Sequence, residues 1–295
     1  GEILNRDSLQ SSIRRQFGLQ TDYRKIEPAE EGIAEMMVHF YKTYNAPLNK
    51  ATLCHWHKMV TNGRFDLKDI GKYRTHEDPM QVVSGAMGRS VVHFQAPASK
   101  QVSKEMNQFL IWFNDSEKGN KIEHSAIVRA AVAHLYFESI HPFEDGNGRI
   151  GRAISEKSLS QSLGRPTLLA LSHTIEENKK SYYDALERNN KDLEVSDWIS
   201  YFCETILNAQ DYTQKAINFI IEKGRFYKRF DKQLNERQLK VVERIFREGV
   251  NGFIGGLSAK NYMSISGVPS ATATRDLTKM VEIGAFRKTG ELKRT

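Results

Sequence analysis

Apolar residues recur at helical spacing along most of this chain, which predicts a mainly α-helical protein. Positions three, four and seven apart share one face of a helix, so each stripe of apolar residues marks an amphipathic helix. In the larger, N-terminal part of the chain the expected helices are 6–17, 28–44, 49–60, 103–113, 125–140, 149–163, 178–188, 196–209 and 212–230. Three shorter helices are expected near the C-terminus, at 235–247, 258–263 and 270–282.

One of these segments, 125–140, is apolar on nearly every side. A helix with that profile is buried on most of its faces, so we expect it to be the central helix of a bundle. It ends directly before His141. His134 lies seven residues earlier, on roughly the same face, and is interpreted as a core histidine rather than a chemical group.

The helical spacing stops between residues 71 and 97. Tyr73-Arg74, Gln81–Val83 and Val91–Phe94 have the composition of short strands, and the last two predict a hairpin. A hairpin beside an active site can bind an extended peptide by pairing with its backbone. A plain surface hairpin is the alternative interpretation.

Composition places the chain among globular proteins. Hydrophobic residues make up 39% and charged residues 27% of 295 positions, and no apolar run reaches the roughly 18 residues of a membrane span. No signal-peptide pattern opens the sequence, so we expect a cytoplasmic protein with no membrane partner.

Cys54 and Cys203 lack metal or redox spacing. The neighbouring His55 and His57 point to different helix faces, which predicts packing or surface roles for them.

Charge is distributed unevenly along the chain. Residues 222–295 contain 16 lysines and arginines and 8 acidic residues, a net charge of +8, whereas the whole chain has +7. Three expected helices and a basic segment, 285–294, that could form two strands around a glycine turn are typical of a winged helix-turn-helix module. The third helix of such a module enters the major groove of duplex DNA; the residues expected to reach it are Thr272, Thr274, Arg275 and Lys279. Protein contacts or dimerisation are the alternative roles.

The chemistry is concentrated in His141-Pro-Phe-Glu-Asp-Gly-Asn-Gly-Arg-Ile-Gly-Arg152. Gly146 and Gly148 flank Asn147, so the backbone can turn tightly and present its N–H groups. The helix that follows adds its N-terminal end, where unpaired N–H groups and the helix dipole attract anions. The segment therefore predicts a binding site for phosphate oxygens.

The charged residues of the segment complete a reactive site. Asp145 is a hard carboxylate suited to Mg²⁺, and Arg149 and Arg152 are spaced to clamp successive phosphates. His141 can accept a proton from a hydroxyl at neutral pH. Phe143 has no such chemistry and is expected to anchor the loop in the core. Together these residues favour in-line attack by a hydroxyl on a nucleotide phosphorus; a glycine-rich turn with incidental charges is the alternative.

This motif resembles the signature of the Fic/Doc family at each of its fixed positions. The similarity extends to Gly71-Lys-Tyr-Arg74, to the hairpin, to the 125–140 helix and to residues 182–198. The resemblance implies a helical bundle with a β-hairpin flap. It also implies transfer of AMP from ATP, with Mg²⁺, to a serine, threonine or tyrosine hydroxyl of a target protein.

The resemblance further assigns a role to individual residues. It makes His141 the general base and Asp145 the Mg²⁺ ligand, and it places the γ-phosphate at Arg152. The α- and β-phosphates are assigned to the loop amides and side chains of Gly146, Asn147, Gly148 and Arg149. Tyr182 or Tyr183 is assigned to the adenine pocket, and the target segment to the flap residues Gln81, Val82 and Val83. Gly148 stands where the kinase-like Doc branch carries lysine, which favours adenylyl over phosphoryl transfer.

Many Fic proteins also carry an inhibitory helix with the string Ser/Thr-x-x-x-Glu-Gly/Asn, which this sequence lacks. Residues 1–5 and 11–15 resemble the sequence that directly follows that helix in relatives with an N-terminal brake. We expect that the chain begins just after, or within, the inhibitory motif and is released from autoinhibition.

The sequence therefore predicts a Fic-type helical bundle with a flap and a small C-terminal winged helix-turn-helix domain. The expected parts are N-terminal helices at 1–70, a catalytic core at 71–210, a linker helix at 211–232 and the winged-helix-like domain at 233–295. Protein adenylyl transfer is the predicted activity, and a homodimer is an expected form. The alternatives are a nucleotide-sensing DNA-binding transcriptional regulator and a Fic-fold phosphotransferase.

Overall fold

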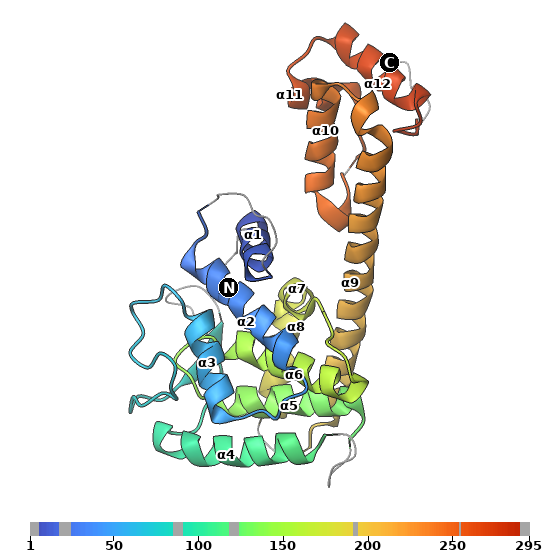
Figure 1. Cartoon of the computed structure of the whole chain (residues 1–295). Helices are drawn as coiled ribbons and strands as arrows, with labels where there is room; N and C mark the ends of the chain where they lie inside the picture. The colour runs from blue at the N-terminus through green and yellow to red at the C-terminus, as the bar shows by residue number, and fades with distance from the viewer. Residues whose placement is uncertain are drawn as a thin grey trace. The chain divides into compact units, whose positions relative to one another are not determined.

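The computed structural model describes residues 6–17, 25–84, 91–117, 124–190, 194–253 and 255–289. Within these ranges the regular structure is helical except for one antiparallel hairpin (Figure 1). The predicted mainly helical fold with a hairpin is thereby confirmed. The chain divides into two compact units, residues 1–210 and 211–295, and each is described by itself.

The first unit is a bundle built around one helix. Its helices are α1 (Arg6–Gln16), α2 (Pro28–Thr43), α3 (Lys50–Val60), α4 (Ser99–Asp115), α5 (Ala126–Ile140), α6 (Asn147–Leu163), α7 (Leu171–Glu177), α8 (Lys179–Asn189) and the start of α9 (Ser196–Phe230). In Figure 1, α5 runs between α4 and α6, and it packs against both.

Helix α5 is buried on two opposite sides, as its apolar sequence predicts. Ala133, Phe137 and Ile140 belong to a core cluster shared with α2, α3, α4 and α6. Ala130 and Leu135 belong to a second cluster, shared with α7, α8 and the first turns of α9. Since both clusters hold α5, the residue at its C-terminal end, His141, has a fixed position.

Side chains and glycines at the expected positions define several helix ends. The side chain of Asn49 accepts a hydrogen bond of 2.9 Å from the Thr52 N–H and so caps α3. Ser125 caps α5 in the same way. Helix α6 ends at Gly164, whose φ of 67° suits glycine.

Three expected elements differ from the structure. Tyr73 and Arg74 form no strand, because Arg74 bonds to the loop after α5 instead of to a neighbouring strand. Helix α7 was not predicted, since seven residues give too short a stripe. The expected helices 196–209 and 212–230 are a single helix, α9, because neither Gln210 nor Asp211 interrupts helical hydrogen bonding as proline does.

The predicted hairpin is present. Strand β1 (Gln81–Ser84) pairs antiparallel with β2 (Val91–Gln95), with an irregularity between Val82 and Val83. Strand β2 lies beside α8. The hairpin tip, 85–90, is outside the described residues. The expectation about an inhibitory segment rests on residues 1–5, which are also outside them, and on residues 11–15 of α1; it stays a prediction.

The second unit holds the end of α9 together with α10 (Glu236–Arg247), α11 (Ala259–Ser266) and α12 (Ser270–Glu282). Asn235 and Gln238 form a reciprocal capping box that starts α10. Buried Asp276 joins the three helices: it accepts a 2.8 Å hydrogen bond from the Tyr262 hydroxyl and pairs with Arg237 at 3.3 Å.

A winged helix-turn-helix stays a prediction for this unit. Residues 285–289 form no strand, and residues 290–295, which complete the expected wing, are outside the described part of the chain. The boundaries expected at residues 70 and 232 also stay predictions. None of the described helices combines the length and apolar character required to cross a bilayer.

Candidate active site

The motif loop connects the central helix α5 to α6, and the end of α3 with the segment after it covers one side of the loop. The reactive residues therefore come from two packed helix ends rather than from a long surface loop. A site built on helix ends is positioned by the bundle core.

His141 ends α5 in the left-handed backbone conformation, with φ 48° and ψ 61°. Among the described residues it is the only non-glycine with a positive φ. Such a conformation costs free energy and persists where the surrounding structure imposes it, often at functional sites. Its side chain is 13% exposed, and burial lowers the pKa of His141 to about 4. The imidazole is therefore neutral at pH 7 and can accept a proton.

Arg74 holds the backbone on either side of the candidate base. Its Nε donates to the carbonyl of His141 at 2.8 Å, and its own N–H donates to the carbonyl of Pro142 at 2.9 Å. The guanidinium also contacts the carbonyls of Pro97 and Ile140. Because the carbonyl end of a helix attracts a cation, buried Arg74 stabilises the end of α5.

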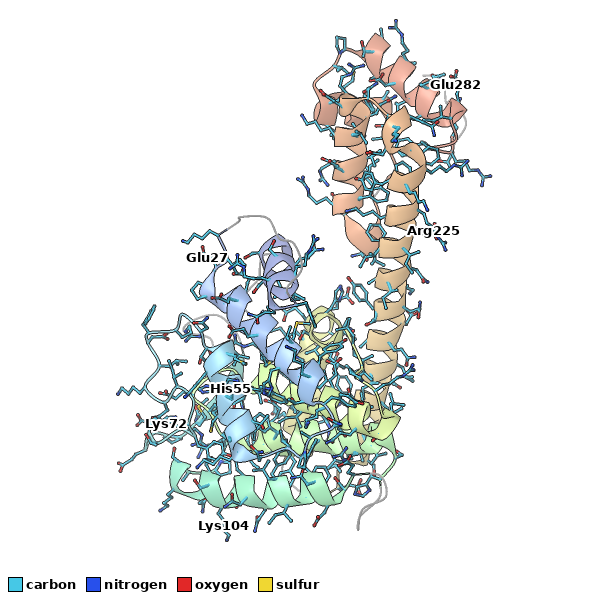
Figure 2. All side chains as sticks on the ribbon, viewed as in Figure 1. Glu27, His55, Lys72, Lys104, Arg225 and Glu282 are labelled. Atoms are coloured by element: carbon cyan, nitrogen blue, oxygen red, sulfur yellow. The ribbon has the colours of Figure 1, made fainter. Side chains whose placement is uncertain are left out.

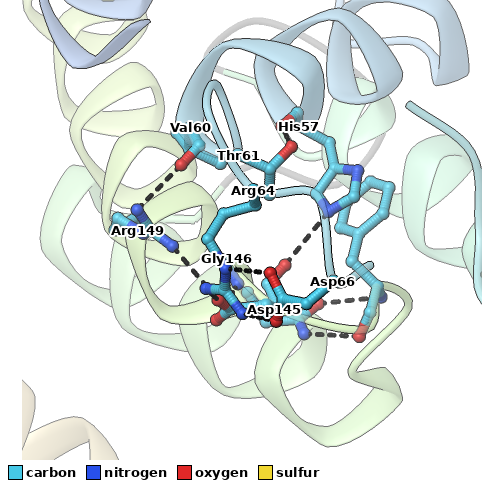
Figure 3. A network of polar contacts seen from close by, with 10 residues as sticks. His57, Val60, Thr61, Arg64, Asp66, Asp145, Gly146 and Arg149 are labelled. Atoms are coloured by element: carbon cyan, nitrogen blue, oxygen red, sulfur yellow. Dashed lines mark hydrogen bonds and ion pairs between the residues drawn. The ribbon is translucent and has the colours of Figure 1, made fainter. Parts of the chain in front are cut away.

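His57 fixes the loop from α3. Its ring stacks on Phe143, with centroids 4.2 Å apart. The Gly71 N–H donates to Nδ1 at 2.9 Å, so Nε2 carries the proton and donates to the carbonyl of Asp145 at 3.1 Å (Figure 3). Burial lowers the pKa of His57 to about 4, which keeps this arrangement neutral. His55, on the same helix, is exposed (Figure 2). The packing role predicted for one of these histidines is therefore that of His57, and the surface role is that of His55.

Asn147 serves the loop with its side chain. Its Oδ1 accepts from the Phe143 N–H at 3.0 Å and its Nδ2 donates to the Phe143 carbonyl at 2.8 Å. The side chain is therefore buried and bonded within the loop, and the backbone N–H of Asn147 lies in the first turn of α6, where N–H groups have no partner within the helix. The predicted phosphate contact of Asn147 stays a prediction. Gly146, with φ 80°, precedes that turn, and a Cβ there would lie 2.9 Å from Val60.

Asp145 carries the carboxylate nearest the start of α6. Its Oδ1 accepts from the Gly146 N–H at 2.6 Å, and its Oδ2 pairs with Arg64 and, at 3.5 Å, with Arg149 (Figure 3). The carboxylate is 39% exposed, so it is accessible to a cation.

The described residues include no cluster of three histidines, cysteines or carboxylates that could hold a metal by themselves. One accessible carboxylate fits Mg²⁺ bound together with a nucleotide, because phosphate oxygens and waters supply the other ligands of that ion. Arg64, which contacts the carboxylate from the segment after α3, has to move aside for such a cation.

The two motif arginines contact different elements. Nη1 of Arg149 donates to the carbonyl of Val60, at the end of α3, at 2.8 Å. Nε of Arg152 donates to the hydroxyl of Ser172, in α7, at 2.8 Å. The two guanidinium groups are therefore held by α3 and α7 respectively, and their role in clamping successive phosphates stays a prediction.

The other predicted site residues lie on α8, on strand β1 and on α12. Tyr182 is buried, and its hydroxyl bonds to Nε2 of His134 at 2.8 Å, whereas Tyr183 is half-buried. His134 is thus a core histidine, as predicted, and the adenine-pocket role of the tyrosines stays a prediction. Gln81 of the flap is exposed; the side chains of Val82 and Val83 are outside the description. On α12, Thr274, Arg275 and Lys279 are exposed and Thr272 is half-buried.

Several residues that shape the site carried no sequence signal for that role. Arg64 and His57 reach Asp145 from 81 and 88 positions away. Arg74 lay in a segment expected to be a strand. Glu138 of α5 lies beside His141, and Gly151 of α6 lies next to its carboxylate. Position 151 is one that the family signature leaves open.

Part of this chain is similar to known proteins. Residues 47–159 match the model of the Fic/DOC family. A protein adenylyltransferase Fic from Aedes aegypti is 30% identical over 148 residues, which are 48% of this chain and 27% of the relative. Protein adenylyltransferase fic-1 from Caenorhabditis briggsae is 30% identical over 134 residues, 45% of this chain and 22% of the relative.

The fold agrees with that match. A Fic family protein from Desulfovibrio desulfuricans G20, 21% identical, aligns with a TM-score of 0.51 over 92% of this chain and 74% of its own. The chain matches about a quarter of the length of the two curated relatives. The predicted resemblance to the Fic/DOC family is therefore confirmed for residues 47–159.

Proposed function

We propose that this chain is a protein adenylyltransferase that moves AMP from ATP to a serine, threonine or tyrosine hydroxyl of a target protein. The observation that carries the proposal is the position of His141: a buried, neutral imidazole at the end of α5, next to the N-terminal end of α6 and the carboxylate of Asp145. Two relatives of the domain are named protein adenylyltransferases, which supports the same activity.

In this reaction His141 accepts a proton, and other residues of the site bind the phosphates. His141 takes the proton of the attacking hydroxyl as that oxygen forms a bond to the α-phosphorus. The bond from this phosphorus to the β-phosphate oxygen breaks, and pyrophosphate leaves with the electron pair. The backbone N–H groups at the start of α6, with Arg149 and Arg152, bind phosphate oxygens and stabilise the charge that develops on them.

Asp145 would hold Mg²⁺, which neutralises phosphate charge when it is bound with ATP. Replacing Asp145 with asparagine is expected to weaken binding of a non-hydrolysable Mg²⁺–ATP analogue by roughly tenfold or more, because a neutral amide is a poor ligand for a hard cation. Titration calorimetry measures this affinity. Exposed Asp197, at the start of α9, offers the matched control, and Asp197→Asn is expected to bind the analogue like the unmodified chain. If Asp145→Asn binds the analogue as tightly as the unmodified chain does, Asp145 is not a ligand of the metal.

Mass spectrometry tests the activity. The chain is incubated with ATP and Mg²⁺, alone and with a cell lysate, and modified peptides are searched for a hydroxyl side chain carrying AMP. Peptides carrying AMP support the proposal; peptides carrying a phosphate instead would favour the Fic-fold phosphotransferase. If neither modification forms while nucleotide binds, the nucleotide-sensing regulator becomes the better account.

A second candidate function, binding of duplex DNA, is favoured by the basic residues of α12. Arg275 and Lys279 are exposed on one helix of a segment with excess positive charge. If they contact phosphates, the full chain binds a DNA duplex more weakly as salt rises, and Arg275→Ala with Lys279→Ala reduces the salt dependence by about two phosphate contacts. Fluorescence anisotropy over a salt series measures it, and an unchanged slope would reject these residues as DNA ligands.

A further inference from the structure

A buried carboxylate lies beside the candidate base. Glu138, in the last turn of α5, places its Oε2 at 3.6 Å from Nδ1 of His141. The backbone carbonyl of Glu138 lies 3.3 Å from the same nitrogen. One residue therefore presents two oxygens to the side of the imidazole that does not face a substrate hydroxyl when Nε2 is the base.

The packing of α6 on α5 makes room for this carboxylate. A Cβ at Gly151 of α6 would lie 2.5 Å from Oε1 of Glu138 and 3.2 Å from the ring of His134. Any larger side chain at position 151 would displace the carboxylate. Gly151 thus explains how a glutamate can lie between two closely packed helices.

Burial of this group is costly. The side chain of Glu138 is 7% exposed, and its Oε1 has no hydrogen-bond partner in the described part of the chain. An unsatisfied buried oxygen destabilises a fold, so its presence requires an explanation, of which a role in function is one.

The titratable groups around the pair come from three helices and two loops. Burial raises the pKa of Glu138 to about 7, and the charge of Arg152 on α6 opposes that rise. His134 of α5 and Tyr182 of α8 lie on the same side, and burial lowers the pKa of His134 to about 3. The positive charge of Arg74 lowers the pKa of His141, and the negative charge of Asp145 raises it; burial has a larger effect than either charge. Near neutral pH the histidines are uncharged and Glu138 is passing between its two forms.

We propose that Glu138 is a positioning residue for His141. Its carbonyl and carboxylate hold the proton on Nδ1, so Nε2 keeps the lone pair that accepts the hydroxyl proton. The carboxylate then stabilises the imidazolium formed in that step, in which one proton moves from the hydroxyl to Nε2 and none moves to Glu138. This role rests on the proposed adenylyl transfer, but the tautomer of His141 exists without it.

A spectroscopic test needs no activity. Nitrogen-15 NMR of the full chain, labelled at histidine and without nucleotide, reports which ring nitrogen of His141 carries the proton. We expect Nδ1 to be protonated and its signal to shift as Glu138 ionises near pH 7. In Glu138→Gln that shift is expected to disappear. A mixture of tautomers, or identical titrations of the two proteins, would overturn the proposal whether or not AMP is transferred.

A kinetic test separates positioning from a merely structural role. The kcat for AMP transfer is expected to rise with pH through about 7, as the Glu138 carboxylate forms; this rise is the limb of the pH profile that the test follows. Glu138→Gln is expected to lower kcat at least about tenfold and to remove this limb. Glu138→Asp, which keeps the carboxylate, is expected to restore the limb in part. An unchanged pH profile in Glu138→Gln, or a loss of stability and a rise in KM at unchanged kcat, would contradict the proposal.

Glu156 provides the matched control. It lies in α6, and burial raises its pKa as well, to about 8, but its carboxyl group accepts a hydrogen bond from the Leu169 N–H at 2.8 Å, away from His141. Glu156→Gln is expected to keep the limb near pH 7. If Glu156→Gln removes that limb as Glu138→Gln does, the limb does not report on Glu138, and the proposal fails.

Discussion

Replacing His141 with alanine is expected to lower the rate of AMP transfer by roughly 10²–10⁴-fold, the contribution typical of a general base. The loss should lie in kcat rather than in nucleotide affinity, because in the proposed site the start of α6, and not the imidazole, binds the phosphate oxygens. Initial rates over a range of ATP concentrations, with calorimetric binding of a non-hydrolysable analogue, measure the two quantities separately.

The control for this variant is His55→Ala. His55 is exposed on α3, outside the motif loop (Figure 2), and its removal is expected to leave the rate unchanged. If His141→Ala transfers AMP at the rate of the unmodified chain, another group takes the proton and the proposed mechanism is wrong.

Replacing Arg74 with methionine is expected to destabilise the first unit by about 3 kcal/mol or more. Hydrogen bonds from charged groups contribute roughly 1.5–3 kcal/mol each, and methionine leaves the carbonyls of Pro97 and His141 without this donor. A loss of that size lowers the Tm of a unit of this length by roughly 6–12 °C. Because Arg74 also fixes the backbone of His141, AMP transfer is expected to fall at temperatures where the variant is still folded.

Thermal unfolding by circular dichroism, together with rates at 20 °C below each Tm, tests this second prediction. Arg165→Met is the matched control: Arg165 is exposed after α6, and surface substitutions usually change stability by less than about 0.5 kcal/mol. A Tm for Arg74→Met equal to that of Arg165→Met would show that the end of α5 is held by other contacts.

The central helix and the motif loop could be predicted because their signals are local. An apolar profile on every side indicates a buried helix such as α5, and a run of glycines before a helical stripe indicates a helix N-terminus such as that of α6. Asn49, Ser125 and Gly164 define helix ends through bonds or backbone angles within a few residues of themselves. Such features require no knowledge of the rest of the fold.

The supporting residues could not be predicted because their partners are distant in sequence. His57 looks like any histidine of an amphipathic helix until Asp145, 88 positions later, is placed against it. The bonds of the Asn147 side chain to the backbone of Phe143 become evident only in the folded loop. Glycine at position 151 gains a meaning only when α6 is packed on Glu138. These are consequences of helix packing, which spacing along the chain does not encode.

The most direct test of adenylyl transfer follows the label from ATP. The chain and its His141→Ala variant are incubated with Mg²⁺ and a cell lysate, with ATP labelled at the α-phosphate in one series and at the γ-phosphate in another. We predict that protein becomes labelled from α-labelled ATP alone, and that the variant loses this labelling. Labelling from γ-labelled ATP that depends on His141 would contradict AMP transfer and make the site a phosphotransferase.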